Sequence, residues 1–92
     1  VITREYKYTI GEKLKNELTD LLMNVYRANK VRSNSLKLKK IEESIENIEV
    51  VRLLFRLLKD LHEISIDDHV KISCKIENVR RQLYGWQKAL RR

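Results

Sequence analysis

The chain has 92 residues, of which 42% are hydrophobic and 36% are charged, and it contains no proline and only 2 glycines. A β-protein of this size needs turn residues at each reversal of the chain, so this composition excludes that class and predicts an all-α domain. The 20 Lys and Arg against 13 Asp and Glu give a net charge of +7. This balance favours an acidic partner such as nucleic acid, an anionic membrane surface or an acidic protein.

Several kinds of site lack the residues that they would need. The only cysteine, Cys74, excludes an intrachain disulfide and a cysteine-based zinc site. His62 and His69 are too few for a catalytic metal cluster, and Gly11 and Gly85 are too far apart for a phosphate-binding loop. We therefore expect no metal, no other cofactor and no small-molecule substrate. A single free thiol is compatible with a reducing compartment, so we expect a cytoplasmic protein.

The first predicted helix begins at Thr9 and ends near Lys30. Thr9 and Glu12 have the spacing of a capping box, in which two side chains satisfy backbone N–H groups of the first turn. Apolar residues then follow in steps of three and four, which is typical of an amphipathic helix. This stripe comprises Ile10, Leu14, Leu18, Leu21, Val25 and Ala28. Met23 lies on the opposite, polar side, as either an isolated exposed side chain or a contact with a neighbouring subunit.

The second predicted helix spans residues 36–62 and follows a linker at 31–35 that offers Ser and Asn as caps. Its second half is apolar around most of its circumference, which is typical of a helix buried on more than one side. In so short a chain we expect one of these sides to face another subunit, which also compensates for a small core. The expected oligomer contacts are Met23, Val50, Leu53, Leu54 and Leu57.

The third predicted helix follows a second capping signal, Ser65 with Asp68, and runs to Leu90. Its apolar stripe repeats in steps of four and three. The stripe comprises Ile72, Ile76, Val79, Leu83, Trp86 and Leu90. We expect Trp86 to pack in the core rather than to stack on bases. Gly85 either permits a close approach of backbones or is tolerated at a cost of roughly 1 kcal/mol.

Two arginines interrupt the most apolar part of the second helix. Arg52 and Arg56 are four residues apart, so both guanidinium groups project from the same side of the helix. A buried charge is costly unless it is paired. One interpretation is local pairing of Arg52 with Glu49 and of Arg56 with Asp60. The other is binding of an outside anion, either a phosphate or a partner's carboxylate, which suits the guanidinium fork.

A second basic group lies on the third helix. It comprises Arg80, Arg81, Lys88, Arg91 and Arg92. Repeated around an oligomer, these side chains would form a strongly positive surface that binds phosphates in a salt-dependent manner. The alternative is a solvated helix end, where cations interact favourably with the helix dipole.

Catalysis and membrane binding receive little support. His69 and Ser73 form a surface pair four residues apart, but no activated nucleophile stands beside either histidine, so we expect no enzyme. The apolar stretch at residues 50–58 is too short to span a bilayer. Basic amphipathic helices can lie on anionic lipid, but all three apolar stripes are needed for one another, so we expect no membrane partner.

Four segments, taken in order, resemble one known family of small helical proteins. They are Tyr8–Leu14, Tyr26–Asn29, Arg52–Leu61 and Gly85–Trp86. They resemble the Avd-like four-helix-bundle family, which includes the accessory variability determinant of diversity-generating retroelements and the bundle proteins of rRNA intervening sequences. The match covers nearly the whole chain, which we interpret as one antiparallel helical-bundle domain over residues 1–92. Because family members carry one more helix before these segments, we expect Val1–Tyr6 to be the tail of a preceding helix.

The resemblance implies a non-enzymatic protein that forms a basic, barrel-like homopentamer. In retroelements the accessory protein binds the reverse transcriptase and template RNA or cDNA. The family's paired arginines match Arg52 and Arg56 of this sequence, and its basic C-terminal end matches Lys88, Arg91 and Arg92. The alternative branch, that of the rRNA intervening sequences, implies a structural four-helix bundle with no dedicated nucleic-acid role.

Overall fold

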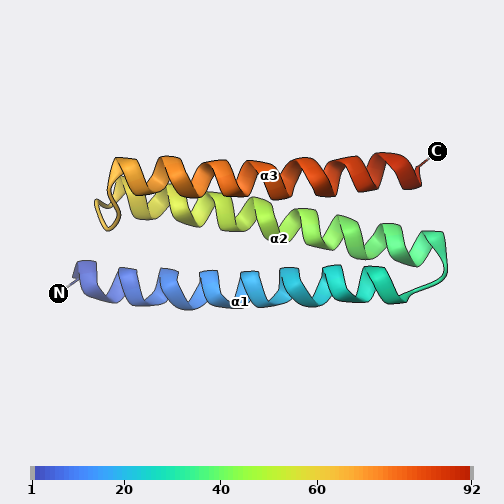
Figure 1. Ribbon diagram of the computed structural model, residues 1–92. Coiled ribbons are helices and arrows are strands. Elements are labelled where there is room, and N and C mark those ends of the chain that lie inside the picture. The colour runs from blue at the N-terminus through green and yellow to red at the C-terminus, as the bar shows by residue number, and fades with distance from the viewer. Residues whose placement is uncertain (1, 92) are drawn as a thin grey trace.

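A computed structural model of the chain describes the backbone of residues 2–91 and the side chains of residue 5 and residues 7–91. Three helices make up almost all of it: α1 (Ile2–Lys30), α2 (Asn34–Asp60) and α3 (Ile66–Leu90). Successive helices are antiparallel, and α2 lies between the other two (Figure 1). Residues 2–91 contain no strand, which confirms the prediction of an all-α chain.

The packing is that of two helical hairpins that share α2. α2 packs against both neighbours, whereas no Cα atom of α1 lies within 8 Å of α3 in the described part of the chain. The Cα atoms extend over 49 × 22 × 14 Å, so the three helices form an elongated layer. The predicted antiparallel packing is therefore present, and no fourth helix occurs within residues 2–91.

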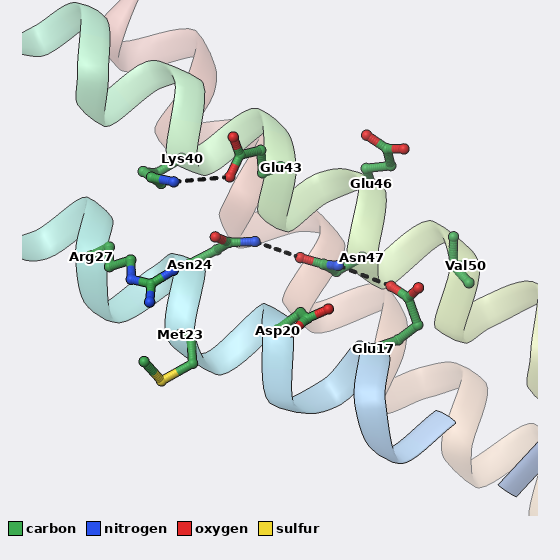
Figure 2. A pocket seen from close by; sticks show the side chains of 10 residues that line it. All are labelled: Glu17, Asp20, Met23, Asn24, Arg27, Lys40, Glu43, Glu46, Asn47 and Val50. Carbon is green, nitrogen blue, oxygen red and sulfur yellow. Dashed lines mark hydrogen bonds and ion pairs between the residues drawn. The ribbon is translucent and has the colours of Figure 1, made fainter. Parts of the chain in front are cut away.

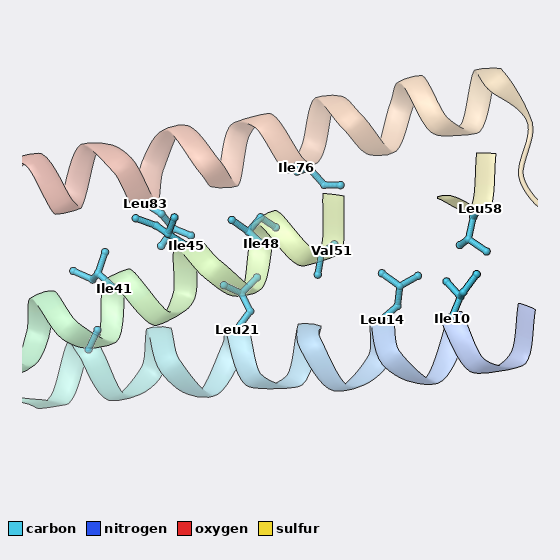
Figure 3. Packing of buried hydrophobic residues seen from close by; sticks show 11 residues of the cluster. Ile10, Leu14, Leu21, Ile41, Ile45, Ile48, Val51, Leu58, Ile76 and Leu83 are labelled. Atoms are coloured by element: carbon cyan, nitrogen blue, oxygen red, sulfur yellow. The ribbon is translucent and has the colours of Figure 1, made fainter. Parts of the chain in front are cut away.

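The apolar core lies along the sides of α2 that meet α1 and α3 (Figure 3). Its members are Ile10, Leu14, Leu21, Ala28, Ile41, Ile45, Ile48, Val51, Leu58, Ile76 and Leu83. Two residues of the predicted stripes are instead exposed, Leu18 on α1 (40%) and Val79 on α3 (36%). Both helices pack on α2 alone, so neither helix covers the flank of the other.

Among the side chains that the structure describes, one polar group is fully buried, and it is hydrogen-bonded. Ser44 is 0% exposed, and its hydroxyl donates to the carbonyl oxygen of Lys40 at 2.9 Å. Trp86 packs against the core, as expected. A Cβ atom added to Gly85 would meet nothing within 4 Å, so no other backbone of this chain approaches it closely.

The predicted start of the first helix is wrong. α1 begins at Ile2 and runs through Thr9, whose exposed side chain lies inside the helix rather than at its end. No proline or glycine lies between Ile2 and Thr9, so the helix continues through this segment. The backbone N–H groups after Thr9 then bond to carbonyl groups of the preceding turn and do not need a capping side chain. The expectation that Val1–Tyr6 belong to a preceding helix is also wrong for residues 2–6, which are continuous with α1; Val1 lies outside the described residues.

Serine caps set the starts of the other two helices. The Ser65 hydroxyl accepts from the backbone N–H of Asp68 at 3.0 Å, which confirms the second capping signal. The Ser33 hydroxyl accepts from the backbone N–H of Leu36 at 3.4 Å, so α2 begins at Asn34, slightly before the predicted residue 36. α1 ends at Lys30, as predicted.

α2 ends before its predicted last residue because His62 adopts a left-handed backbone conformation with φ of 61°. The N–H of His62 donates to the carbonyl of Lys59 at 3.0 Å, and the N–H of Glu63 donates to that of Leu58 at 2.9 Å. This pair of bonds is a Schellman motif, which satisfies carbonyl groups at the end of a helix. It reverses the chain into α3.

Candidate nucleic-acid and partner interface

Glu49 of α2 is the centre of the charged contacts between α2 and α3. Its carboxylate accepts hydrogen bonds from Arg80 Nε at 2.8 Å and Arg80 Nη2 at 3.1 Å. The Tyr84 hydroxyl donates to it at 3.1 Å, and Arg52 Nε approaches it to 3.4 Å. The Arg80 hydrogen bonds lower the pKa of Glu49 below its ordinary value, with help from Tyr84 and against the effect of partial burial. The same contacts raise the pKa of Arg80.

Two of the predicted binding residues on α3 are engaged within the chain. Arg80 also donates to Glu77 at 2.7 Å, so its guanidinium bridges acids on α2 and on α3. Arg91 donates to Glu42 at 2.8 Å. These two arginines hold α3 against α2, and their charges are locally compensated.

Arg52 and Arg56 line one groove between α2 and α3, of about 450 Å³. Of the two local pairs expected from the sequence, that of Arg52 with Glu49 is present, whereas Arg56 makes no ion pair within the described residues. Asp60 instead lies 3.7 Å from Lys59 Nζ. Arg56 is therefore an exposed cation with no ion pair in the described residues, and it lines a separate pocket on α2 together with Asp60.

The groove also contains two residues that the sequence did not assign to a binding site. His69 and Ser73 line it from α3 together with Glu77, and Leu53 lines it from α2. The sequence signal was the spacing of four residues, which places both side chains on one side of a helix. The spacing does not predict that His69 and Ser73 face Arg52 and Arg56, because that depends on how α3 is rotated about its axis relative to α2.

The remaining basic residues of α3 lie outside the groove. Arg81 and Lys88 are exposed and make no ion pair within the described residues. Arg92 lies outside the described residues. The predicted basic group on α3 is thus divided into arginines engaged with acids of this chain and cations that point to solvent.

Some of the predicted oligomer contacts are exposed, and others are packed within the chain. Leu53 and Leu57 are 66% and 43% exposed, next to Arg56 on a surface of α2 that no helix covers. Leu54 packs partly against the core within the chain. Val50 is half-buried and Met23 is 42% exposed, and both line a groove between α1 and α2.

This second groove, of about 410 Å³, has a polar floor (Figure 2). Asn24 Nδ2 donates to Asn47 Oδ1 at 2.8 Å, and Asn47 Nδ2 donates to Glu17 Oε2 at 2.9 Å. The charged side chains that line it are Glu17, Asp20, Arg27, Lys40, Glu43 and Glu46. The groove could not be predicted from the sequence, because its acids come from two different helices.

Residues 2–91, the part of the chain that the structure describes, contain neither a metal-binding cluster nor a helix that could span a membrane. No group of three or more His, Cys, Asp or Glu is arranged to hold a metal ion in this part of the chain. None of its helices combines the length and the apolarity required to cross a membrane.

A family model described as bAvd-like matches residues 2–90, almost the entire chain. The chain belongs to the bAvd-like family. This finding confirms the resemblance inferred from the four segments. No curated protein and no solved structure matches the chain. In this bAvd-like protein, one side of the central helix α2 carries Arg56 together with the exposed Leu53 and Leu57.

Proposed function

We propose that this bAvd-like protein is a non-enzymatic accessory subunit of a diversity-generating retroelement. In this proposal it forms a basic homo-oligomer, a pentamer by analogy with the family, that binds reverse transcriptase and template RNA or cDNA. Membership of the bAvd-like family supports the retroelement role. The observation that carries the proposal is the exposed surface of α2, where Leu53 and Leu57 stand beside Arg52 and Arg56.

The apolar part of this surface favours self-association. Complete burial of a leucine side chain contributes roughly 1.5–3 kcal/mol, and Leu53 is two-thirds exposed in the single chain at 66%. Exposed apolar side chains rimmed by charge are typical of protein–protein contacts. A second subunit on this surface would give α2 the two-sided burial that its sequence pattern predicts.

Self-association is tested by the solution mass, measured by light scattering behind a sizing column. We expect the wild-type particle to contain several copies of the 11.1-kDa chain. Leu53→Asp should shift the mass towards that of one chain, because a buried aspartate would lose its water without gaining a partner. Leu36→Asp is the matched control, since Leu36 is 53% exposed at the opposite end of α2. A wild-type monomer would contradict the oligomeric part of the proposal.

Binding of the enzyme and of RNA is tested by co-purification with the reverse transcriptase of a diversity-generating retroelement and with its template RNA. Arg52→Ala with Arg56→Ala should remove capture of one or both, while the helical circular dichroism spectrum is retained. Lys13→Ala with Lys15→Ala removes the same charge from exposed positions of α1 and should leave capture intact.

The alternative is the structural bundle of the rRNA intervening-sequence type. It predicts a gene inside an rRNA operon and no capture of either ligand by the wild type. Equal loss of capture in the lysine control would show that net charge, rather than the α2 surface, determines binding.

A further inference from the structure

We propose that the groove between α2 and α3 is a phosphate-binding site built by Arg52, Arg56, His69 and Ser73. The inference deepens the proposed function and rests on it, because it identifies the chemical group of a nucleic acid that this surface takes. Its new element is the contribution of α3, since His69 and Ser73 complete a site of which the arginines form one wall.

The two walls of the groove have the same spacing. Arg52 and Arg56 are one helical turn apart on α2, and His69 and Ser73 are one turn apart on α3. All four line the same space of about 450 Å³. Residues four apart lie on the same side of a helix, so each wall presents two adjacent donor side chains to the groove.

The acids near the groove are already engaged. Glu77, which also lines it, accepts from Arg80 at 2.7 Å, and Glu49 accepts from the same guanidinium at 2.8 Å. Arg52 approaches Glu49 through Nε at 3.4 Å, whereas Arg80 makes the shorter contact with the same carboxylate at 2.8 Å. Arg56 has no acid partner within the described residues. Arg80 thus neutralises the carboxylates, and positive charge remains at the mouth of the groove.

The donor set fits a phosphate better than a carboxylate. A carboxylate has two oxygens in one plane, which a single guanidinium can satisfy. Here two guanidinium groups, a hydroxyl and an imidazole come from opposite walls, and a tetrahedral phosphate presents oxygens in both directions. In the single chain the groove is open to solvent, since Arg52 and Arg56 are exposed, so a phosphodiester of a longer strand can enter from the side.

The first test uses a fluorescein-labelled single-stranded RNA and measures fluorescence anisotropy over a salt series. His69→Ala with Ser73→Ala removes two donors and should weaken RNA binding about tenfold, from the usual strength of two hydrogen bonds. The slope of log K against log salt should stay unchanged, because neither residue carries a lysine or arginine charge. Arg52→Ala with Arg56→Ala should instead lower that slope by roughly one to two.

The matched control is Asn78→Ala with Gln82→Ala, which removes two exposed polar side chains of α3 that do not line the groove. We expect it to bind RNA as the wild type does. Ser73→Ala alone guards against loss of folding by the double variant, since alanine favours the helix, and should weaken binding severalfold. If the His69 and Ser73 variants bind RNA as the wild type does, the phosphate site is refuted while the proposed function stands.

The second test titrates inorganic phosphate into the wild type at constant pH and ionic strength and follows the imidazole proton resonances by NMR. The His69 resonance should shift in a saturable manner, and that of His62, outside the groove, should not. A phosphate shift in a protein that binds no RNA would retain the site and refute the nucleic-acid function. An equal shift with acetate would overturn the phosphate assignment in favour of an acidic protein partner, and no shift with either would refute the site.

Discussion

His62 provides the most direct test of the helix boundaries. It is a non-glycine residue at φ of 61°, and it holds the position after the helix cap that glycine usually occupies. The left-handed conformation costs an L-residue roughly 1–2 kcal/mol, although histidine tolerates it better than most residues do. We expect His62→Gly to raise the free energy of unfolding by about 1 kcal/mol, because glycine keeps both Schellman bonds and removes the steric cost.

The expected change in the free energy of unfolding is close to the full steric cost, because His62→Gly removes few native interactions. The His62 side chain is exposed and makes no hydrogen bond within the described residues, so little native interaction is lost. A gain of 1 kcal/mol should raise the melting temperature by roughly 4–8 °C in a domain of this size. The assay is thermal and urea unfolding followed by circular dichroism, at one fixed protein concentration because association also changes apparent stability.

The control for this prediction is Gln82→Gly, which places glycine at an exposed position inside α3. There the residue costs about 1 kcal/mol relative to good helix formers. The reasoning is refuted if His62→Gly lowers the unfolding midpoint as the control does. That result would mean that residue 62 has negative φ and that α2 continues past Asp60.

Three further substitutions probe the helix contacts, each measured by the same unfolding assays. Glu49→Gln should cost about 1 kcal/mol at neutral pH, since the charged bonds to Arg80 are only partly screened. Folding lowers the pKa of Glu49, so its stabilising contribution is present above the pKa of the unfolded state, near 4.3, and is lost as the pH falls through the folded-state pKa. On acidification the Glu49→Gln variant should therefore lose less stability than the wild type. Ile41→Ala should cost roughly 2–5 kcal/mol, because this side chain is 0% exposed. Gly85→Ala should add up to about 1 kcal/mol, since its new Cβ meets nothing within 4 Å.

Local signals in the sequence predicted the helix boundaries to within two residues except at the start of α1, and that exception has a physical explanation. Ser65 caps α3 because the preceding turn interrupts the helix. Its hydroxyl therefore accepts from the backbone N–H of Asp68, which has no carbonyl partner in a preceding helical turn. Thr9 has the same kind of pattern but sits within a continuous helix, where its first-turn N–H groups already have partners. A capping pattern therefore predicts a start only where something nearby interrupts the helix.

The candidate site was only half predictable. Spacing along α2 placed Arg52 and Arg56 on one side of a helix, which the structure confirms. The partners of each charge depend on the rotation and register of α3 against α2, and sequence spacing does not fix these. The sequence alone therefore predicts either a solvated or a phosphate-binding Arg80, whereas the structure pairs it with Glu49. The sequence spacing predicts only a surface pair of His69 with Ser73.

The absence of backbone contact between α1 and α3 has a consequence for the way the molecule opens. The two outer helices are coupled mainly through α2, apart from the ion pair of Lys7 with Glu63 of the α2–α3 turn at 3.7 Å, so the packing resembles a short one-dimensional array. α3 can then detach while the α1–α2 hairpin stays folded, since such partial opening is normal for units with separate interfaces. Arg56 and His69 come from opposite sides of the interface that this opening would break, so fraying of α3 would take apart the groove between them.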